Sequence, residues 1–321
     1  MGAKPLVHYE DEASYWAAVE EGRANLIGAP GSHEWAALAE TDVYVYFWGP
    51  EDNGRLDRLP AKTSEKLVEF NPEWYKRAAK YGVRGVRMAI ARATPANARH
   101  WGVSLSAWQK ELAASSALDP ETYRNKAEKL RRSLEGAGKV RVRHPNGTDL
   151  SLRLVRRKAT TVLGLATPSE VRKGPRPFGV MANVPDGSVY VAVDERTAEG
   201  TVVANRNLAG FGSPIRGAKW TFRGGRLMRQ SYEEGGDIVR KAFAAGKAGR
   251  DRPGMLEVGL DPKARIAPMM QENELGAVSI GIGSNAGFGG KTRANFNAIL
   301  TVAGAELTVG DRTVVRGGHV F

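Results

Sequence analysis

The chain has 321 residues, 42% hydrophobic and 26% charged, which excludes a disordered or fibrous protein and leaves room for two folded domains. It contains no cysteine, which excludes a disulfide framework, a thiolate nucleophile and a cysteine-ligated zinc or iron–sulfur site. Basic residues outnumber acidic ones by 47 to 35, so the formal net charge of +12 attracts acidic partners.

The N-terminus has neither the basic nor the apolar region of a secretory signal, and no window has the apolar length of a membrane span. We therefore expect a cytoplasmic protein with no membrane contact. The basic residues are spread along the chain without a helix-turn-helix, zinc-finger or RNP-like motif. An acidic peptide is thus favoured over nucleic acid as the partner.

The first part of the chain predicts alternating helices and strands. Thr94 and Ser104 are placed to cap helices, and glycines follow the predicted helix ends. The run at 41–50 is almost wholly apolar and predicts a buried strand ended by Gly49-Pro50. The predicted helices span 12–21, 71–82, 95–102, 104–117 and 119–138, and the predicted strands span 41–50 and 85–91.

The pattern then changes to a period of two residues, typical of strands. Asn146-Gly147 lies between two alternating segments and predicts a tight hairpin. Short strands follow at 188–194, 200–206, 219–230, 256–260, 278–283, 296–304 and 306–315, interrupted by one helix at 236–246. The predicted fold class is α+β, with an N-terminal α/β domain (1–160) and a β-rich C-terminal domain (161–321).

A glycine-rich loop, GSNAGFGG, follows the strand at 278–283. It lacks the Lys-Ser/Thr of a phosphate-binding P-loop and the spacing of a dinucleotide fingerprint. We expect a flexible or tight turn between strands at the rim of a cleft.

Several sequence blocks occur in the order found in one known family. The blocks LEVGLDP, GAVSIGIGSN and GGKTRANFNAIL, preceded by GVSLSAWQKEL and NGTDLSLRLVRR, resemble the thermophilic-type metallo-aminopeptidases (the aminopeptidase T and S group). They also resemble the related iron-dependent 2,5-dihydroxypyridine dioxygenase. The resemblance covers roughly residues 80–318 and implies the fold of that family with a shortened N-terminal region.

The resemblance also implies that most metal ligands have been replaced. A family histidine corresponds to Ser279, and a family glutamate corresponds to Ser188. The family's His-x-Asp pair corresponds to Asn297 and Ile299, or to Asn295 and Asn297 if the register shifts by two residues. Only the glutamate at Glu257 is retained. Because zinc and iron sites of this kind need three or more ligands, we expect no metal and no other cofactor.

The remaining polar residues of this region allow two interpretations. Glu257 either forms a salt bridge with Lys263, Arg265 or Arg293, or receives an amine or amide of a ligand. Ser188 and Ser279 have no histidine placed to act as a base, which disfavours nucleophilic catalysis. The residues expected to bind a peptide are Ser188, Glu257, Ser279, Lys291, Arg293, Asn295 and Asn297, and for the last four the alternative is a solvated loop.

Two functions follow from these expectations. The first is a non-catalytic peptide-binding protein, a pseudoenzyme that presents an acidic precursor peptide to modifying enzymes of the same pathway. The resemblance points to ribosomal modified-peptide biosynthesis of the crocagin type. The alternative is a metal-dependent aminopeptidase or ring-cleaving dioxygenase with an unorthodox site. The family resemblance further implies a homodimer.

Overall fold

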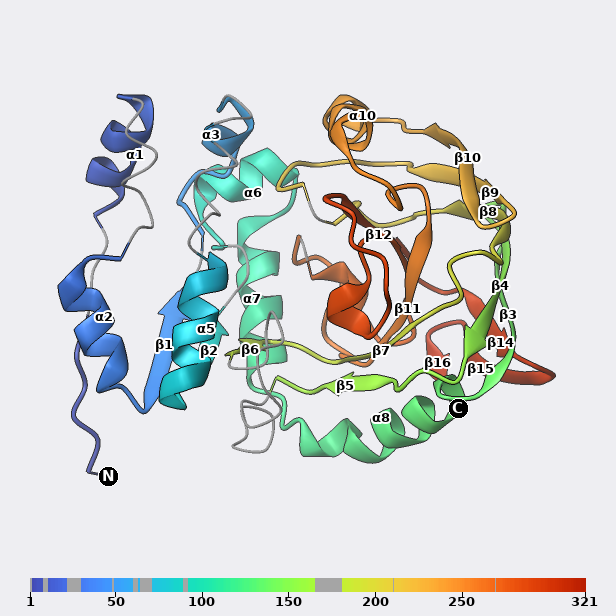
Figure 1. Cartoon of the computed structure of the whole chain (residues 1–321), viewed down its shortest axis with the longest axis horizontal. Coiled ribbons are helices and arrows are strands. Elements are labelled where there is room, and N and C mark those ends of the chain that lie inside the picture. The colour runs from blue at the N-terminus through green and yellow to red at the C-terminus, as the bar shows by residue number, and fades with distance from the viewer. Residues whose placement is uncertain are drawn as a thin grey trace.

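The computed structural model describes residues 2–7, 11–21, 30–47, 49–59, 63, 71–88, 92–164, 181–209, 211–268 and 270–321. Helices and strands are mixed in an α+β arrangement, which confirms the predicted fold class. A small parallel sheet lies at one end of the molecule, and two larger sheets pack together at the other (Figure 1). No helix in the described part of the chain is long and apolar enough to cross a membrane.

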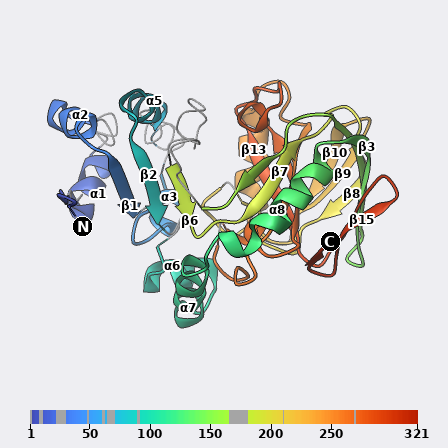
Figure 2. The same ribbon diagram turned by 90° about the horizontal axis from the view of Figure 1, so that it is seen from below.

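The small sheet has the strand order β1 (Val43–Phe47), β2 (Arg84–Met88) and β6 (Met181–Val184), and its strands are parallel. Helices α2 (Ser32–Ala39) and α5 (Asn71–Tyr81) pack against one face through a cluster that includes Leu38, Ala78 and Trp74. Figure 2 shows both helices on the same side of the sheet. Helices α1 (Glu12–Glu20) and α3 (Gly54–Asp57) complete this end.

Strand β1 is not buried, and this corrects the prediction for 41–50. Tyr44 packs on Trp74 with ring centroids 5.1 Å apart, whereas the opposite face exposes Val43, Val45 and Phe47, the last at 71%. Within the described residues, β1 pairs with β2 alone. A continuous apolar run therefore marks an edge strand here, which the sequence pattern does not distinguish from a central one.

Three helices connect the small sheet to the larger ones: α6 (Pro95–Trp101), α7 (Leu105–Ser116) and α8 (Glu121–Leu134). The predicted caps form, since Thr94 accepts a hydrogen bond from the Asn97 N–H at 3.1 Å and Ser104 caps α7. Helix α8 buries Leu130 and Leu134 in the main core and packs along β7 (Figure 2).

The largest sheet has eight strands in the order β10-β9-β8-β4-β3-β14-β15-β16. Its centre is the predicted hairpin, in which His144 pairs with Thr148. The bounds are β3 (Ala137–His144), β4 (Thr148–Val155), β8 (Glu199–Val203), β9 (Lys219–Arg223), β10 (Arg226–Ser231), β14 (Glu306–Val309), β15 (Arg312–Arg316) and β16 (His319–Val320).

The third sheet has five strands in the order β13-β12-β11-β7-β5. One of its faces packs against the eight-stranded sheet, and together they enclose the main core, which includes Val258, Ile280, Leu152 and Trp220. The bounds are β5 (Thr160–Val162), β7 (Ser188–Ala192), β11 (Pro253–Gly259), β12 (Val278–Gly283) and β13 (Asn297–Val302); helix α10 (Gly236–Ala245) and the short helices η2 (Gln271–Asn273) and η3 (Ala286–Phe288) lie in the connections.

Sheet membership crosses the domain boundary expected at residue 160. Strands β3 and β4 lie before it and belong to the eight-stranded sheet, while β6 lies after it and belongs to the small parallel sheet. The chain thus forms the first strands of the larger sheets, returns once to the small parallel sheet to add β6, and then completes the larger sheets.

Candidate functional site

One row of polar side chains crosses the five-stranded sheet on the face that points away from the main core. Glu257 of β11 pairs with Ser279 of β12, and Ser279 pairs in turn with Thr301 of β13. On the other side of Glu257, the partner is Tyr190 of β7. Directly opposed residues share a face, and their neighbours along each strand point into the core. Three of the predicted residues, Ser188, Glu257 and Ser279, therefore lie together.

The row is enclosed and its hydroxyl groups are engaged. Ser279 Oγ lies 2.9 Å from Thr301 Oγ1, and Ser188 hydrogen-bonds the carboxyl group of Glu257. Glu257 is 7% exposed, and the two serines and Thr301 are at most 1% exposed. A ligand can reach these side chains only if the covering loops move.

Among the described residues, the charged neighbours that shift the pKa of Glu257 are acidic rather than basic. Burial raises its pKa to about 7, the Ser188 hydrogen bond opposes that rise, and the charge of Asp186 adds to it. None of the three candidate salt-bridge partners is among the groups that shift this pKa. The salt-bridge interpretation of Glu257 therefore gains no support, because an uncharged carboxyl group is favoured where a cation is missing.

Two further carboxyl groups belong to the same environment. Burial raises the pKa of Glu272 to about 8, with a smaller contribution from Glu257, and burial raises that of Asp186 to about 6. Asp186 comes from the turn before β7, and Glu272 comes from η2. Sequence analysis missed both because they lie in loops. The one sequence feature that indicated either residue is that Asp186 lies two residues before the predicted site residue Ser188.

The segment that carries Glu272 is held against the sheet by a close backbone approach. A Cβ atom on Gly259 would lie 2.2 Å from the carbonyl oxygen of Glu274. Asp261 fixes the same segment, because its N–H donates to the Asn273 carbonyl at 2.8 Å and its carboxylate accepts from the Lys263 N–H at 2.7 Å. Glycine at 259 is thus required for the cover over Glu257.

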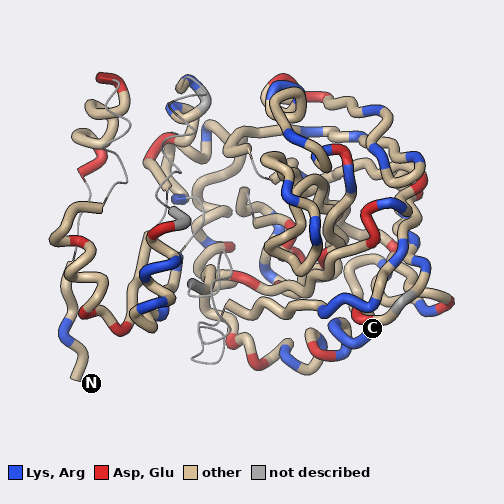
Figure 3. Tube along the Cα trace, viewed as in Figure 1, with Lys and Arg blue, Asp and Glu red and all other residues tan. Residues whose placement is uncertain are grey.

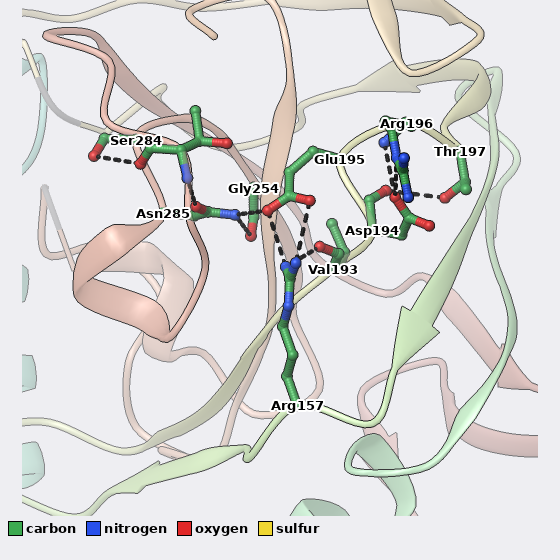
Figure 4. A network of polar contacts seen from close by, with 10 residues as sticks. Arg157, Val193, Asp194, Glu195, Arg196, Thr197, Gly254, Ser284 and Asn285 are labelled. Carbon is green, nitrogen blue, oxygen red and sulfur yellow. Dashed lines mark hydrogen bonds and ion pairs between the residues drawn. The ribbon is translucent and has the colours of Figure 1, made fainter.

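A second covering segment, the glycine-rich loop 284–292, is anchored by a buried polar network (Figure 4). Asn285 is fully buried and donates to Glu195 at 2.6 Å and to the Gly254 carbonyl at 3.2 Å, while its own oxygen accepts from the Thr292 N–H at 2.8 Å. Arg157 holds Glu195 from the other side at 2.9 Å. This loop is therefore a tight turn, one of the two forms expected from sequence.

The other four predicted residues do not join the buried row. Lys291, Arg293, Asn295 and Asn297 are exposed, and Asn295 accepts a hydrogen bond from the Lys247 N–H at 2.5 Å. Asn297 begins β13 and shares a face with Thr301, but four residues of strand separate them by about 13 Å. Ile299 lies between them and bridges to Ala209.

The donor set around Glu257 does not fit a catalytic divalent metal. Zinc and iron in such sites take three or more histidine, cysteine or carboxylate ligands. Beside Glu257 in the sheet stand serine and threonine hydroxyls that bind one another or Glu257, and the carboxyl groups of Asp186 and Glu272 lie outside the sheet. In the part of the chain that the structure describes, no group of three or more His, Asp or Glu residues is arranged to hold a metal ion.

Three comparisons with known proteins bear on this geometry. Residues 61–269 match the family model described as thermophilic metalloprotease (M29), a range that includes Ser188 and Glu257 and ends before Ser279. Wild-type AmpT from Thermus thermophilus has a similar structure, with a TM-score of 0.66 and 18% identity over 98% of this chain and 86% of its own.

A second solved structure, 2,5-dihydroxypyridine dioxygenase from Pseudomonas putida KT2440, gives a TM-score of 0.59 and 17% identity over 90% of this chain and 74% of its own. At these identities the likeness shows the fold alone. A search of the curated proteins finds no significant match.

Proposed function

The chain belongs to the thermophilic metalloprotease family (M29), and from this membership we propose that it binds a peptide without metal-dependent hydrolysis. The observation that carries the proposal is the polar row itself. Where the resemblance places metal ligands, the chain has Ser188 and Ser279, and both hydroxyls already have partners.

The exposed residues Lys291, Arg293 and Asn297, called the rim below, are more accessible to a peptide than the buried polar row. Lys291 and Arg293 are exposed cations on the loop that precedes β13, and Asn297 offers an amide that can donate to and accept from a peptide main chain. The net charge of +12 favours an acidic peptide. The proposed partner is an acidic precursor peptide of ribosomal modified-peptide biosynthesis, delivered to modifying enzymes.

Metal content tests the non-catalytic part of the proposal. The purified protein is expected to contain well under one equivalent of zinc, iron or manganese by elemental analysis, and to release no amino acid from unblocked peptides when these metals are added. One equivalent of bound metal, together with metal-dependent release, would contradict it.

Calorimetric titration tests the binding part. With an acidic peptide, Arg293→Glu and Asn297→Ala are each expected to weaken binding, the second by roughly 1 kcal/mol for a lost hydrogen bond. Thermal unfolding serves as the control for folding. Unchanged affinity in both variants would place the peptide elsewhere on the protein.

A metal-dependent aminopeptidase remains the second candidate. The observation that favours it is that Glu257 is retained and that Asp186 and Glu272 lie near enough to influence its charge. Rearranged carboxylates could then replace the missing histidines. The elemental analysis above separates the two candidates.

A further inference from the structure

The β9–β10 hairpin presents a basic outer face. On β9, Lys219 and Arg223 point outward, while Trp220 and Phe222 between them are buried in the main core. On β10, Arg229 pairs with Thr221 and lies on the same outer face. The alternation of the strand thus places cations on one side and the core on the other.

Two loops extend this face into one continuous surface. Arg252 donates from Nη1 to the carbonyl oxygens of Gly224 and Gly225 in the hairpin turn, at 3.3 and 3.2 Å. The loop that contains Arg252 also contacts the loop before β13, where Asn295 accepts from the Lys247 N–H. The hairpin, the loop 246–252 and the loop 289–296 are therefore joined by direct contacts.

The charge of this surface is strongly one-sided. Segments 219–229, 246–252 and 289–296 contain nine basic residues and one acidic residue. That acid, Asp251, is paired with Arg226 at 3.0 Å, and Glu199 at the border accepts from the Gly224 N–H. Blue positions recur along β10 in Figure 3. Among the described residues, no carboxylate lies within ion-pair distance of Arg223 or Arg229.

The same face contains a hollow beside an open strand edge. A cavity of about 300 Å³ is lined by Lys219, Thr221, Arg229, Gln230 and Ser231. Strand β10 ends the sheet and, within the described residues, pairs with β9 alone; its bulge exposes 62% of Met228. At the start of this edge the Leu227 N–H donates to the Asp251 carbonyl at 2.8 Å, so the edge is open from residue 228 to residue 231. There the outward N–H and C=O groups of an edge strand can pair with an extended peptide.

We propose that the β9–β10 hairpin binds an acidic, extended peptide segment. The segment pairs with the edge of β10 and directs carboxylates to Lys219, Arg223 and Arg229. A peptide fits better than single-stranded nucleic acid, because the aromatic side chains of β9 are buried and leave no platform for base stacking. This inference rests on the proposed function only in taking the partner to be an acidic peptide, and it concerns the hairpin end of the basic surface rather than the loop that carries Lys291 and Arg293.

The test uses the full chain and a fluorescein-labelled peptide of six Glu-Val repeats. In 0.1 M salt, the double variant Arg223→Glu/Arg229→Glu is expected to raise Kd by at least about tenfold, because two attractions become repulsions. The matched control, Lys126→Glu/Lys129→Glu on α8, makes the same change in net charge and is expected to alter Kd by less than about threefold. Thermal unfolding confirms that both variants fold.

Amide hydrogen exchange tests the strand pairing itself, because nonspecific charge attraction does not protect the amides of one strand. Bound peptide is expected to slow exchange in β10 and to leave β16, the other end of the same sheet, unchanged. The inference is overturned if both double variants lose affinity equally, if β10 is not protected, or if the probe does not bind. It is also overturned if a twelve-nucleotide DNA strand binds more tightly than the peptide and the hairpin variant abolishes that DNA binding.

The outcomes also separate this inference from the proposed function. If Arg293→Glu and Asn297→Ala abolish binding while the hairpin variant binds normally, the rim proposal stands and the hairpin inference falls. The reverse result supports the hairpin and removes the rim. Loss of binding in both sets supports one peptide that spans both surfaces.

Discussion

Glu257 is a carboxyl group that the fold keeps protonated to unusually high pH. In the unfolded chain it ionises near the ordinary glutamate pKa of 4.5, and in the folded protein it retains its proton to about pH 7. The stability that this difference provides is complete below pH 4.5 and is lost as the pH rises through 7. Asp186 and Glu272 also make the folded protein less stable as the pH rises, because burial raises both of their pKa values.

We therefore predict that Glu257→Gln flattens the dependence of stability on pH. Between pH 5 and 8 the wild-type protein should lose about 1–3 kcal/mol more unfolding free energy than the variant. Urea denaturation at the two pH values measures this. Glu121→Gln is the control, because Arg124 lowers the pKa of Glu121 and keeps it ionised throughout this range. Parallel stability curves for wild type and Glu257→Gln would contradict the prediction.

The sequence predicted some of the residues that lie beside Glu257 and missed others. Glu257 and Ser279 were expected together because they lie on consecutive apolar strands, and antiparallel pairing does place them opposite each other. The predicted cationic partners of Glu257 were chosen for charge and proximity in sequence. Burial allows a different solution, a carboxyl group that keeps its own proton, and the covering segments that bury it are not placed by any local sequence pattern.

Among the elements, the loop after β12 depends on one amide side chain. Asn285 is itself fully buried and satisfies a carboxylate, a carbonyl and an N–H from three separate segments. Buried partners left without a hydrogen bond are more destabilising than a bond lost at the surface.

We predict that Asn285→Ala lowers the unfolding free energy by about 2–3 kcal/mol. Amide hydrogens in 284–292 should also exchange faster, by more than the global loss of stability explains. Exposed Lys291→Ala in the same loop should change stability by less than about 0.5 kcal/mol. Unaltered exchange in the loop of the Asn285→Ala variant would show that the network does not hold it.

Elements were predicted well where their signals are local. Caps at Thr94 and Ser104 and the Asn146-Gly147 hairpin all form, since each needs only a few consecutive residues. The exposure of β1 and the pairing of β6 with β2 were not predicted, because both depend on segments far away in sequence.

At the scale of the whole molecule, strands from both sides of residue 160 share the same sheets. Core residues Leu130, Val140 and Leu152 precede that point and pack against strands that follow it. We predict that a fragment of residues 161–321 is unfolded by circular dichroism, because it lacks the two central strands of the eight-stranded sheet. A fragment that begins at 104 is the control and should retain β structure. Cooperative unfolding of 161–321 alone would support the boundary expected from sequence.

The central position of the β3–β4 hairpin has a consequence for biosynthesis. On the ribosome this hairpin emerges complete, yet its neighbours β8 and β14 begin only at Glu199 and Glu306. At translation rates of about 5–20 residues per second, one side of the newborn hairpin waits on the order of ten seconds for its final neighbour. Strand β8 can cover the β4 side early, but the edge of β3 stays open to chaperones and to other nascent chains until β14 has been made.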